Sequence, residues 1–162
     1  MNNFFKKAFL SVGFSGFLPK MPGTWGSFFS AIILGSLYFV LPPNIIWRFF
    51  ILAIFYVLIY FLAKRFIKDF LQKDNCDPQW IVIDEFLGLG IAFLPYMLNK
   101  GLNWWLFIFG FALFRLFDIK KIWLVKRMDD LHSAAGVMLD DVVAGIFAAF
   151  IIFAAKIILW LI

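Results

Sequence analysis

Long apolar stretches alternate with short polar segments along most of this 162-residue chain. Five such stretches stand out between Pro, Gly and charged residues, and they cover about 28–42, 45–63, 80–98, 104–118 and 138–161. A membrane-spanning helix needs about 20 apolar residues. Inside a bilayer a helix satisfies its own backbone hydrogen bonds, so helix is the expected state of each stretch. The pattern predicts an all-α integral membrane protein with about five transmembrane helices.

The first 26 residues follow a different pattern, in which Phe residues mix irregularly with lysines. This segment lacks the continuous apolar core and the small-residue cleavage site of a signal peptide. We predict an amphipathic or re-entrant N-terminal segment that lies on the membrane. No linker, low-complexity tract or tandem repeat divides the chain, so residues 1–162 are expected to form a single membrane-embedded domain.

Composition supports a membrane protein and excludes several other classes. Hydrophobic residues make up 64% of the chain and charged residues 15%, whereas soluble domains have about 45–50% and about 25%. The single cysteine, Cys76, excludes an intrachain disulfide and a thiolate-rich metal site. Basic residues beside apolar spans normally contact lipid head groups, so the expected partner is an anionic phospholipid and not a nucleic acid. An oligomer is compatible with the sequence.

The charged residues are distributed unevenly between the two predicted membrane faces. Eleven of the 15 Lys and Arg residues fall in the N-terminal segment and in the loops after the second and fourth stretches. The positive-inside rule then predicts a cytoplasmic N-terminus and an external C-terminus. All ten acidic residues map to the same cytoplasmic face, although they contribute little to that rule. Their collection at one face therefore needs a separate explanation.

Two acidic pairs interrupt apolar sequence, in WIVIDEFLGLG at 80–90 and GVMLDDVVAG at 136–145. A carboxylate at membrane depth costs about 2.5–3.5 kcal/mol, less near a helix end. Asp84 and Glu85 could form an ion pair with a cation or reach interfacial water, and Asp140 could cap a helix N-terminus. Alternatively, both pairs ligate a hard divalent cation, which prefers carboxylate oxygen and water.

Further candidates lie in the loop between the fourth and fifth stretches and just before it. Arg115 and Asp118 are three residues apart and share a helix face, which is compatible with a local salt bridge. In the functional interpretation Asp118 joins the metal ligands, while Arg115 or Lys121 contacts an anion. His132, the single histidine, is either an interfacial acid or base or an ordinary loop residue.

The run PKMPGTWGS at 19–27 forms a Pro/Gly turn that enters the first stretch. Its glycines let the backbone approach a ligand closely. Thr24 and Ser27 can cap the following helix, whose free N–H groups suit phosphate. A turn without any ligand is the alternative. The candidate phosphate contacts in this run are Lys20, Gly23, Thr24, Gly26 and Ser27.

Together these parts indicate a reaction class. Carboxylates, a divalent metal, basic side chains and a helix N-terminus form a site for an anion, most simply a phosphate ester. The position of this site at the inner leaflet implies that the substrate is a lipid head group. A water or hydroxide nucleophile is favoured over an aspartyl-phosphate intermediate.

Four blocks of the sequence, PGTWGS, DPQWIVIDEFLG, FRLFDIKK and HSAAGVMLDDVVAG, occur in the order and at the spacing of a known family. From about Gly13 to Ala148 the chain resembles phosphatidylglycerophosphatase A, a family of small bacterial membrane phosphatases. The resemblance implies Mg²⁺-dependent hydrolysis of phosphatidylglycerophosphate to phosphatidylglycerol and phosphate at the bacterial cytoplasmic (inner) membrane. The residues that match its motifs are Pro22, Gly23, Thr24, Gly26, Ser27, Asp77, Asp84, Glu85, Gly88, Arg115, Asp118, Lys121, His132, Gly136, Asp140, Asp141 and Gly145.

Two departures from the family pattern touch the same cytoplasmic loop. Ile122 and Leu124 stand where the family usually has Pro-x-Pro, and Ser133 and Ala134 replace glycines that often follow the histidine. The acidic residues and Arg115 are intact, so the activity is still expected. The predicted metal ligands are Asp84, Glu85, Asp118, Asp140 and Asp141, and the same acids together with His132 form the predicted catalytic set.

Three other functions compete with the lipid phosphatase. A small transporter or channel would place acids near mid-membrane, with an opening to the outside. A lipid-binding scaffold would hold the same lipid without turnover. A phosphotransferase acting on a nucleotide-linked lipid would usually show a D-G-x-x-A-R type signature, which this chain lacks.

Overall fold

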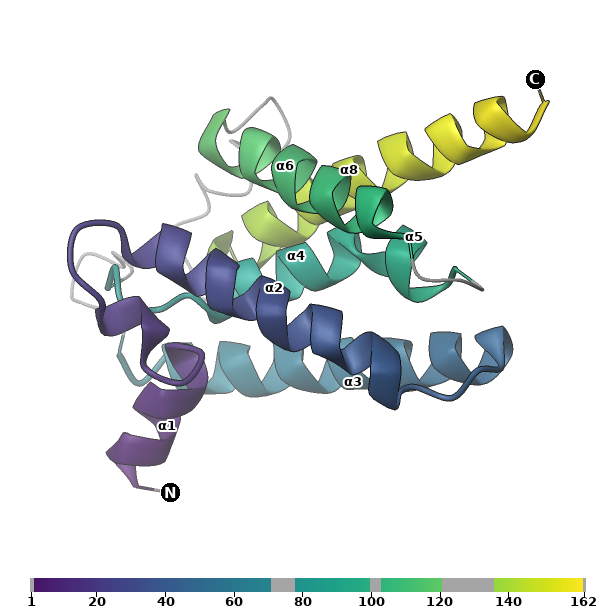
Figure 1. Cartoon of the computed structure of the whole chain (residues 1–162). Coiled ribbons are helices and arrows are strands. Elements are labelled where there is room, and N and C mark those ends of the chain that lie inside the picture. Colours follow the sequence, from purple (N-terminus) through teal and green to yellow (C-terminus); the bar gives the residue numbers. More distant parts are fainter. Residues whose placement is uncertain (1, 71–77, 100–102, 121–135, 162) are drawn as a thin grey trace.

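The computed structural model describes residues 2–70, 78–99, 103–120 and 136–161, with only the backbone at 137 and 159–161. Every regular element in these ranges is a helix, which confirms the all-α prediction for them (Figure 1). The elements are α1 (Asn3–Leu10), the short 3₁₀ helix η1 (Ser15–Phe17), α2 (Pro22–Val40), α3 (Ile45–Ile67), α4 (Ile83–Ala92), α5 (Leu94–Met97), α6 (Trp104–Lys120) and α8 (Gly136–Leu161).

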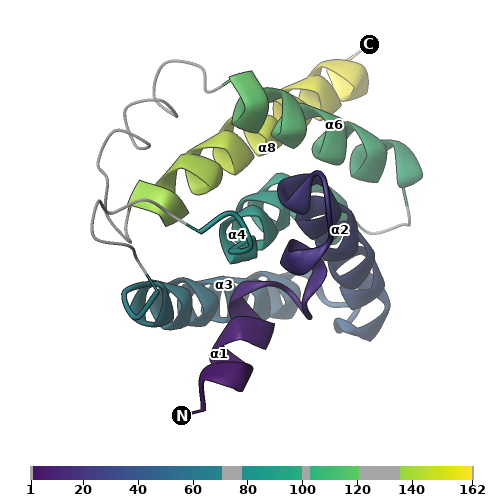
Figure 2. The same ribbon diagram turned by 90° about the vertical axis from the view of Figure 1, so that its left-hand side faces the viewer.

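The short helix α4 occupies the centre of the molecule. Figure 2 shows α4 with α2, α3, α6 and α8 around it, and α4 packs most extensively against α8. Seven of its ten residues are buried, including both of its glycines. A helix covered on all sides suits a position that carries charged side chains at one end, because protein groups rather than lipid then surround them.

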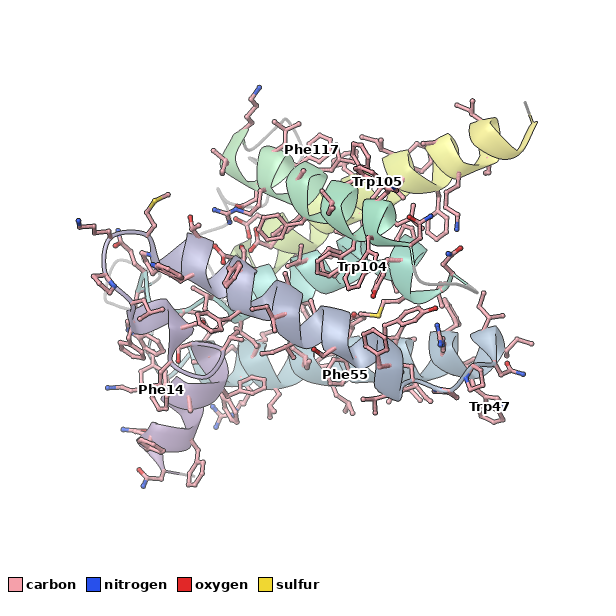
Figure 3. All side chains as sticks on the ribbon, in the orientation of Figure 1. Phe14, Trp47, Phe55, Trp104, Trp105 and Phe117 are labelled. Atoms are coloured by element: carbon pink, nitrogen blue, oxygen red, sulfur yellow. The ribbon has the colours of Figure 1, made fainter. Side chains whose placement is uncertain are left out.

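Among the described residues, three helices are long and apolar enough to cross a membrane, namely α2, α3 and the part of α8 over Met138–Ile158. Many large apolar side chains of these helices point outward, as expected for a membrane protein (Figure 3). The helix α6 has 17 residues and α4 has 10, so both are short for a full span. The number of five spans and the membrane-lying N-terminal segment stay predictions.

Asparagine side chains cap the N-termini of three of the helices. Asn44 Oδ1 accepts hydrogen bonds from the backbone N–H groups of Ile46 and Trp47, at 2.9 and 3.3 Å. Asn103 caps α6 in the same way, and Asn2 caps α1. Asparagine is a strong N-cap residue because its side-chain oxygen satisfies N–H groups that lack a helical partner.

The predicted helix over 80–98 is interrupted in the structure. The helix α4 ends at Ala92, and α5 follows after Phe93. Pro95 carries no backbone N–H and so cannot continue the hydrogen-bond ladder of α4. The chain turns there, and the backbone carbonyls at the end of α5 need other partners.

A buried arginine supplies those partners. Arg48 Nη1 donates to the carbonyl oxygen of Met97 at 3.0 Å, and Arg48 Nε donates to that of Pro42 at 2.6 Å. The guanidinium also lies over the ring of Tyr38, 4.5 Å from its centroid. Arg48 therefore ties α3 to the end of α5 and to the turn that follows α2.

Replacing Arg48 by methionine is expected to lower the thermal stability of the protein in detergent. The substitution keeps the length of the side chain and leaves carbonyls of Pro42 and Met97 without these donors, at a cost of about 3 kcal/mol. For a chain of this size the unfolding midpoint should fall by about 6–12 °C. Lys68→Met, on the exposed end of α3, is the matched control. An unchanged unfolding midpoint for Arg48→Met would contradict the stabilising role of these Arg48 hydrogen bonds.

The first helix is attached to the end of α3 by an ion pair. Lys6 Nζ donates to Asp69 Oδ2 at 2.7 Å, and Arg65 contacts Asp69 Oδ1 at 3.3 Å. The hydrogen bond from Lys6 holds the pKa of the Asp69 carboxyl below its usual value. The charged form of Asp69 therefore favours the docked position of α1.

Acidification should loosen α1. Because the pKa of Asp69 is lowered in the folded state, its contribution is present above the unfolded pKa of about 3.9 and is lost as the pH falls through the folded value. The protection factors of the α1 amides, which are exchange rates corrected for the intrinsic rate at each pH, should fall between about pH 5 and pH 2. Asp69→Asn should show the lower protection factors already at the higher pH. Equal protection factors in the parent and in Asp69→Asn across this range would show that the Lys6–Asp69 ion pair does not hold α1 in place.

The helix directions bring the charged helix ends together. In Figure 1 the starts of α2, α4 and α8 and the ends of α3 and α6 lie towards the same, left-hand end of the molecule. We call this the acidic end. The acidic residues that the structure describes all belong to it, namely Asp69, Asp84, Glu85, Asp118, Asp140 and Asp141.

Candidate active site

Close packing of α4 against α8 sets up the site. A Cβ atom added to Gly145 would overlap the carbonyl oxygen of Gly88, and one added to Gly88 would overlap the carbonyl oxygen of Asp141. These two positions therefore require glycine, because the backbones of the two helices touch there. The acidic pairs lie three to five residues before these glycines, so the contact brings the two pairs close to each other.

Five carboxyl groups from three helices form a cluster with Asp141 at its centre. Asp84 and Glu85 lie in the first turn of α4, Asp118 lies in the last turn of α6, and Asp140 and Asp141 lie in the second turn of α8. Asp141 is 4% exposed, and the negative charges of the other four all act on it. We call this group the carboxylate cluster. So many like charges in a buried place favour the approach of a cation.

Arg115 joins three helices beside the cluster. Its Nη1 donates to Asp118 Oδ2 at 2.6 Å, to Ser27 Oγ at 3.1 Å and to Glu85 Oε1 at 3.3 Å. Ser27 Oγ donates in turn to Glu85 Oε2 at 3.0 Å. The ion pair for Glu85 and the local salt bridge for Asp118, both left open by the sequence, are thus present.

The glycines of α2 make room for a carboxylate. A Cβ on Gly23 would overlap Glu85 Oε1, and a Cβ on Gly26 would lie 2.9 Å from Glu85 Oε2 and press on the side chain of Val82. The close approach predicted at Gly23 and Gly26 is therefore made by Glu85. These glycines position a cluster residue next to Ser27.

The predicted caps at two helix starts are wrong. Thr24 and Ser27 lie inside α2, because the helix already begins at Pro22 and has Met21 as its N-cap, without a side-chain hydrogen bond. Proline suits the first helical position, where its missing N–H needs no partner. Asp140 likewise lies inside α8 rather than at its start, since that helix begins at Gly136.

Both acidic pairs are oriented by the same local contact. Asp84 Oδ1 accepts a hydrogen bond from the backbone N–H of Glu85 at 2.9 Å. Asp140 Oδ1 accepts one from the backbone N–H of Asp141, also at 2.9 Å. In each pair the first carboxylate is held close to the backbone, and the second projects about 100° further around the helix.

The remaining predicted site residues fall into two groups. Lys20 and Thr24 are exposed near the start of α2, and neither takes part in the hydrogen bonds of Arg115. Lys20 has a left-handed backbone with a φ of 74°, which is uncommon for a residue with a side chain. The positions outside the described residues are Asp77, Lys121, Ile122, Leu124, His132, Ser133 and Ala134.

The chemistry of the cluster suits a hard cation. Its donors are carboxylate oxygens, which Mg²⁺ prefers. In the described ranges no three His, Cys, Asp or Glu side chains are grouped tightly enough to hold a metal by themselves. Mg²⁺ is commonly held by one or two carboxylates, several waters and the phosphates of a substrate, rather than by an all-protein cage. The chemistry of this donor set therefore fits Mg²⁺.

Sequence reasoning assigned no structural role to Gly88 and Gly145. A signal was present, because each follows an acidic pair by three to five residues within an apolar helix. Small residues in that setting allow helix backbones to approach each other in membranes. The spacing could have indicated that the two helices cross next to their acids.

Comparison with known proteins gives a consistent result. Residues 8–156 match the family model of phosphatidylglycerophosphatase A. A Bacteroides thetaiotaomicron protein named "Putative phosphatidylinositol-3-phosphatase" is 34% identical over 157 residues, covering 94% of each chain. The phosphatidylglycerophosphatase A of Haemophilus influenzae is 35% identical and that of Escherichia coli 33%, over 91% and 89% of this chain and 86% and 80% of theirs. No solved structure matches the chain significantly.

The family match spans most of the chain and includes all four helices that contribute to the carboxylate cluster and to the bonds of Arg115. The relatives match over most of their own lengths, so the similarity extends to the whole domain. The chain is a phosphatase, and it belongs to the phosphatidylglycerophosphatase A family.

Proposed function

We propose that this protein is a Mg²⁺-dependent phosphatase that converts phosphatidylglycerophosphate to phosphatidylglycerol and phosphate. One observation carries the proposal: carboxylates from α4, α6 and α8 collect around Asp141, directly beside the guanidinium of Arg115. A site for a phosphate monoester needs both a cation to offset its charge and a donor that binds its oxygens.

Each part of the site has a role in this reaction. Asp84, Asp140 and Asp141, with Glu85 and Asp118, would hold Mg²⁺, which when bound polarises the phosphate and lowers the pKa of a water. Arg115 donates to phosphate oxygens and offsets the charge that develops on them. The predicted roles of Lys121 and His132, as a phosphate contact and as an acid or base, complete the proposal.

The substrate assignment follows the names of two relatives. The Haemophilus influenzae and Escherichia coli proteins are named phosphatidylglycerophosphatase A. The Bacteroides thetaiotaomicron relative is named for a phosphatidylinositol 3-phosphatase, which favours a second candidate substrate. Both lipids carry a phosphate monoester on the head group, so the carboxylate cluster and Arg115 would serve either.

The location proposed for the reaction is the cytoplasmic leaflet of the bacterial inner membrane. The Lys and Arg residues at the end of α3 lie at the acidic end, together with the lysines of α1. The positive-inside rule places such an end in the cytoplasm. The site would then meet the lipid head groups of the cytoplasmic leaflet.

Phosphate release by the purified protein in detergent tests the function. With Mg²⁺, phosphatidylglycerophosphate should be hydrolysed faster than phosphatidylinositol 3-phosphate, and thorough chelation should lower the rate by about 10²-fold or more. Added Mg²⁺ should restore the rate. Undiminished release after metal removal would refute the metal requirement. Faster hydrolysis of the inositol lipid would reverse the substrate assignment, and binding of either lipid without release would indicate a scaffold.

A further inference from the structure

The surface between α2 and α6 contains an apolar groove that the reaction chemistry does not use. Both helices pack on α4, whereas they contact each other only sparsely. Two adjoining cavities of about 260 and about 290 Å³ lie between them and share Phe28 and Phe111. We call their combined volume the α2–α6 groove. Its lining residues are Thr24, Trp25, Phe28, Ala31, Ile32, Phe107, Ile108 and Phe111.

The two ends of the groove differ. At one end α2 and α6 converge, because a Cβ on Gly35 would lie 2.9 Å from the ring of Phe107. At the other end the groove reaches Thr24. Ser27 lies one turn along α2 from Thr24, and Arg115 lies one turn along α6 from Phe111. The Arg115–Ser27 hydrogen bond of 3.1 Å bridges the two helices there. The groove thus runs from its narrow apolar end towards Arg115, which lies one turn beyond its lining.

Its length and lining suit much of one hydrocarbon chain. From Thr24 to Ile32, the outermost lining positions on α2, the helix rises about 12 Å at 1.5 Å per residue. This is most of the about 15 Å of hydrocarbon in a single leaflet, which is half of the about 30 Å of the bilayer. Phe28, Ile32 and Ile108 are 49%, 50% and 53% exposed, so the groove opens sideways towards lipid.

We propose that the α2–α6 groove binds one acyl chain of the phospholipid substrate and thereby aligns its phosphate with Arg115. This inference rests on the proposed function. Charge complementarity supports it, because the Arg115 guanidinium lies one turn beyond the apolar lining, where it would meet the anionic phosphate of a lipid whose chain fills the groove. A lipid would reach the site by moving sideways from the bilayer, with its head group at the acidic end throughout.

A larger cavity elsewhere provides the contrasting case. It has a volume of about 670 Å³ between α6 and α8 and is lined by apolar residues together with Asn103 and Lys156. Asn103 precedes the start of α6 and Lys156 lies near the end of α8, whereas the acids of these helices lie at their opposite ends. A chain bound in this cavity would hold its head group away from Arg115.

Filling the groove should change the preference for chain length. Ile32→Trp and Ile108→Trp add bulk from exposed positions of the lining, and Ile33→Trp on the same helix lies outside it. The ratio of kcat/KM for long-chain over short-chain phosphatidylglycerophosphate should fall about 10-fold in the two lining variants. It should stay at the parent value in Ile33→Trp. An unchanged ratio, or the same fall in all three variants, would overturn the groove as the chain site.

A second measurement does not depend on turnover. A phosphatidylglycerophosphate with a photoreactive group in mid-chain is cross-linked to the parent protein, and the adducts are mapped by mass spectrometry. The proposal expects adducts on Phe28, Ile32, Ile108 or Phe111, which excess unlabelled substrate removes. Adducts in the α6–α8 cavity, or spread over α3, would refute it and indicate bulk lipid. Loss of phosphate release with intact groove labelling would refute the proposed function alone.

Discussion

Asp141→Asn is expected to lower kcat for the lipid phosphate by about 10²-fold or more. The side chain lies at the centre of the carboxylate cluster, and asparagine has nearly the same shape without the negative charge. If the cluster binds Mg²⁺, loss of one central charge weakens the binding of the metal. The phosphate of the substrate is then misplaced. Phosphate release across a Mg²⁺ titration measures the effect, and the apparent affinity for Mg²⁺ should fall together with kcat.

Stability and a matched variant separate this result from misfolding. Asp141 is buried among four other carboxyl groups, so removing its charge relieves repulsion and should not lower the thermal midpoint. Asp69→Asn makes the same substitution at the acidic end but outside the cluster, and its kcat should stay within about twofold of the parent. Asp84→Asn and Glu85→Gln should resemble Asp141→Asn. Near-parent rates in all three cluster variants would remove the carboxylates from the mechanism.

Gly145→Ala is expected to produce a large structural effect for the addition of a single methyl group. The added Cβ would overlap the carbonyl oxygen of Gly88, a backbone atom that cannot rotate away, so α4 and α8 must separate. Overpacking of this kind costs about 1–3 kcal/mol. Because the cluster spans the same contact, a displacement of about 1 Å should also lower kcat by about 10²-fold. Thermal unfolding and phosphate release measure the two effects.

Gly110→Ala is the control for that substitution. Gly110 is also buried in a helix contact, but its added Cβ would lie 2.9 Å from the ring of Phe93, a side chain rather than a backbone atom. The control should lose some stability and keep kcat within about threefold of the parent. If Gly145→Ala retains both stability and kcat, the close contact of α4 with α8 is not what holds the cluster together.

Much of the architecture could be predicted from the sequence. The stretch over 45–63 corresponds to α3, which begins at Ile45, because apolar length and a preceding asparagine define the start of a helix. The stretch over 28–42 was placed too late, since α2 begins at Pro22. The glycines of that run indicated a turn, whereas they lie inside the helix to make room for Glu85. A glycine that leaves room for a side chain of another helix looks the same in the sequence as a glycine that forms a turn.

The collection of the acidic residues was easier to predict than their hydrogen bonds. Counting cations placed all acids at one face, and the described acids do collect at one end of the molecule. The bond from Arg115 to Asp118 follows from their spacing of three residues. The bond to Glu85 could only be offered as one alternative, because it joins residues on different helices. Sequence spacing describes one helix and does not give the register between two.

The central position of α4 has a consequence for how the protein is made. This helix leaves the ribosome before α6 and α8, which later cover it and contribute Arg115, Asp118 and the second acidic pair. During that interval its acidic first turn lacks the neighbours that surround it in the folded protein. Nascent chains that stop before α6 should therefore remain bound to insertion factors or be degraded, whereas chains that include α8 should be released into the bilayer.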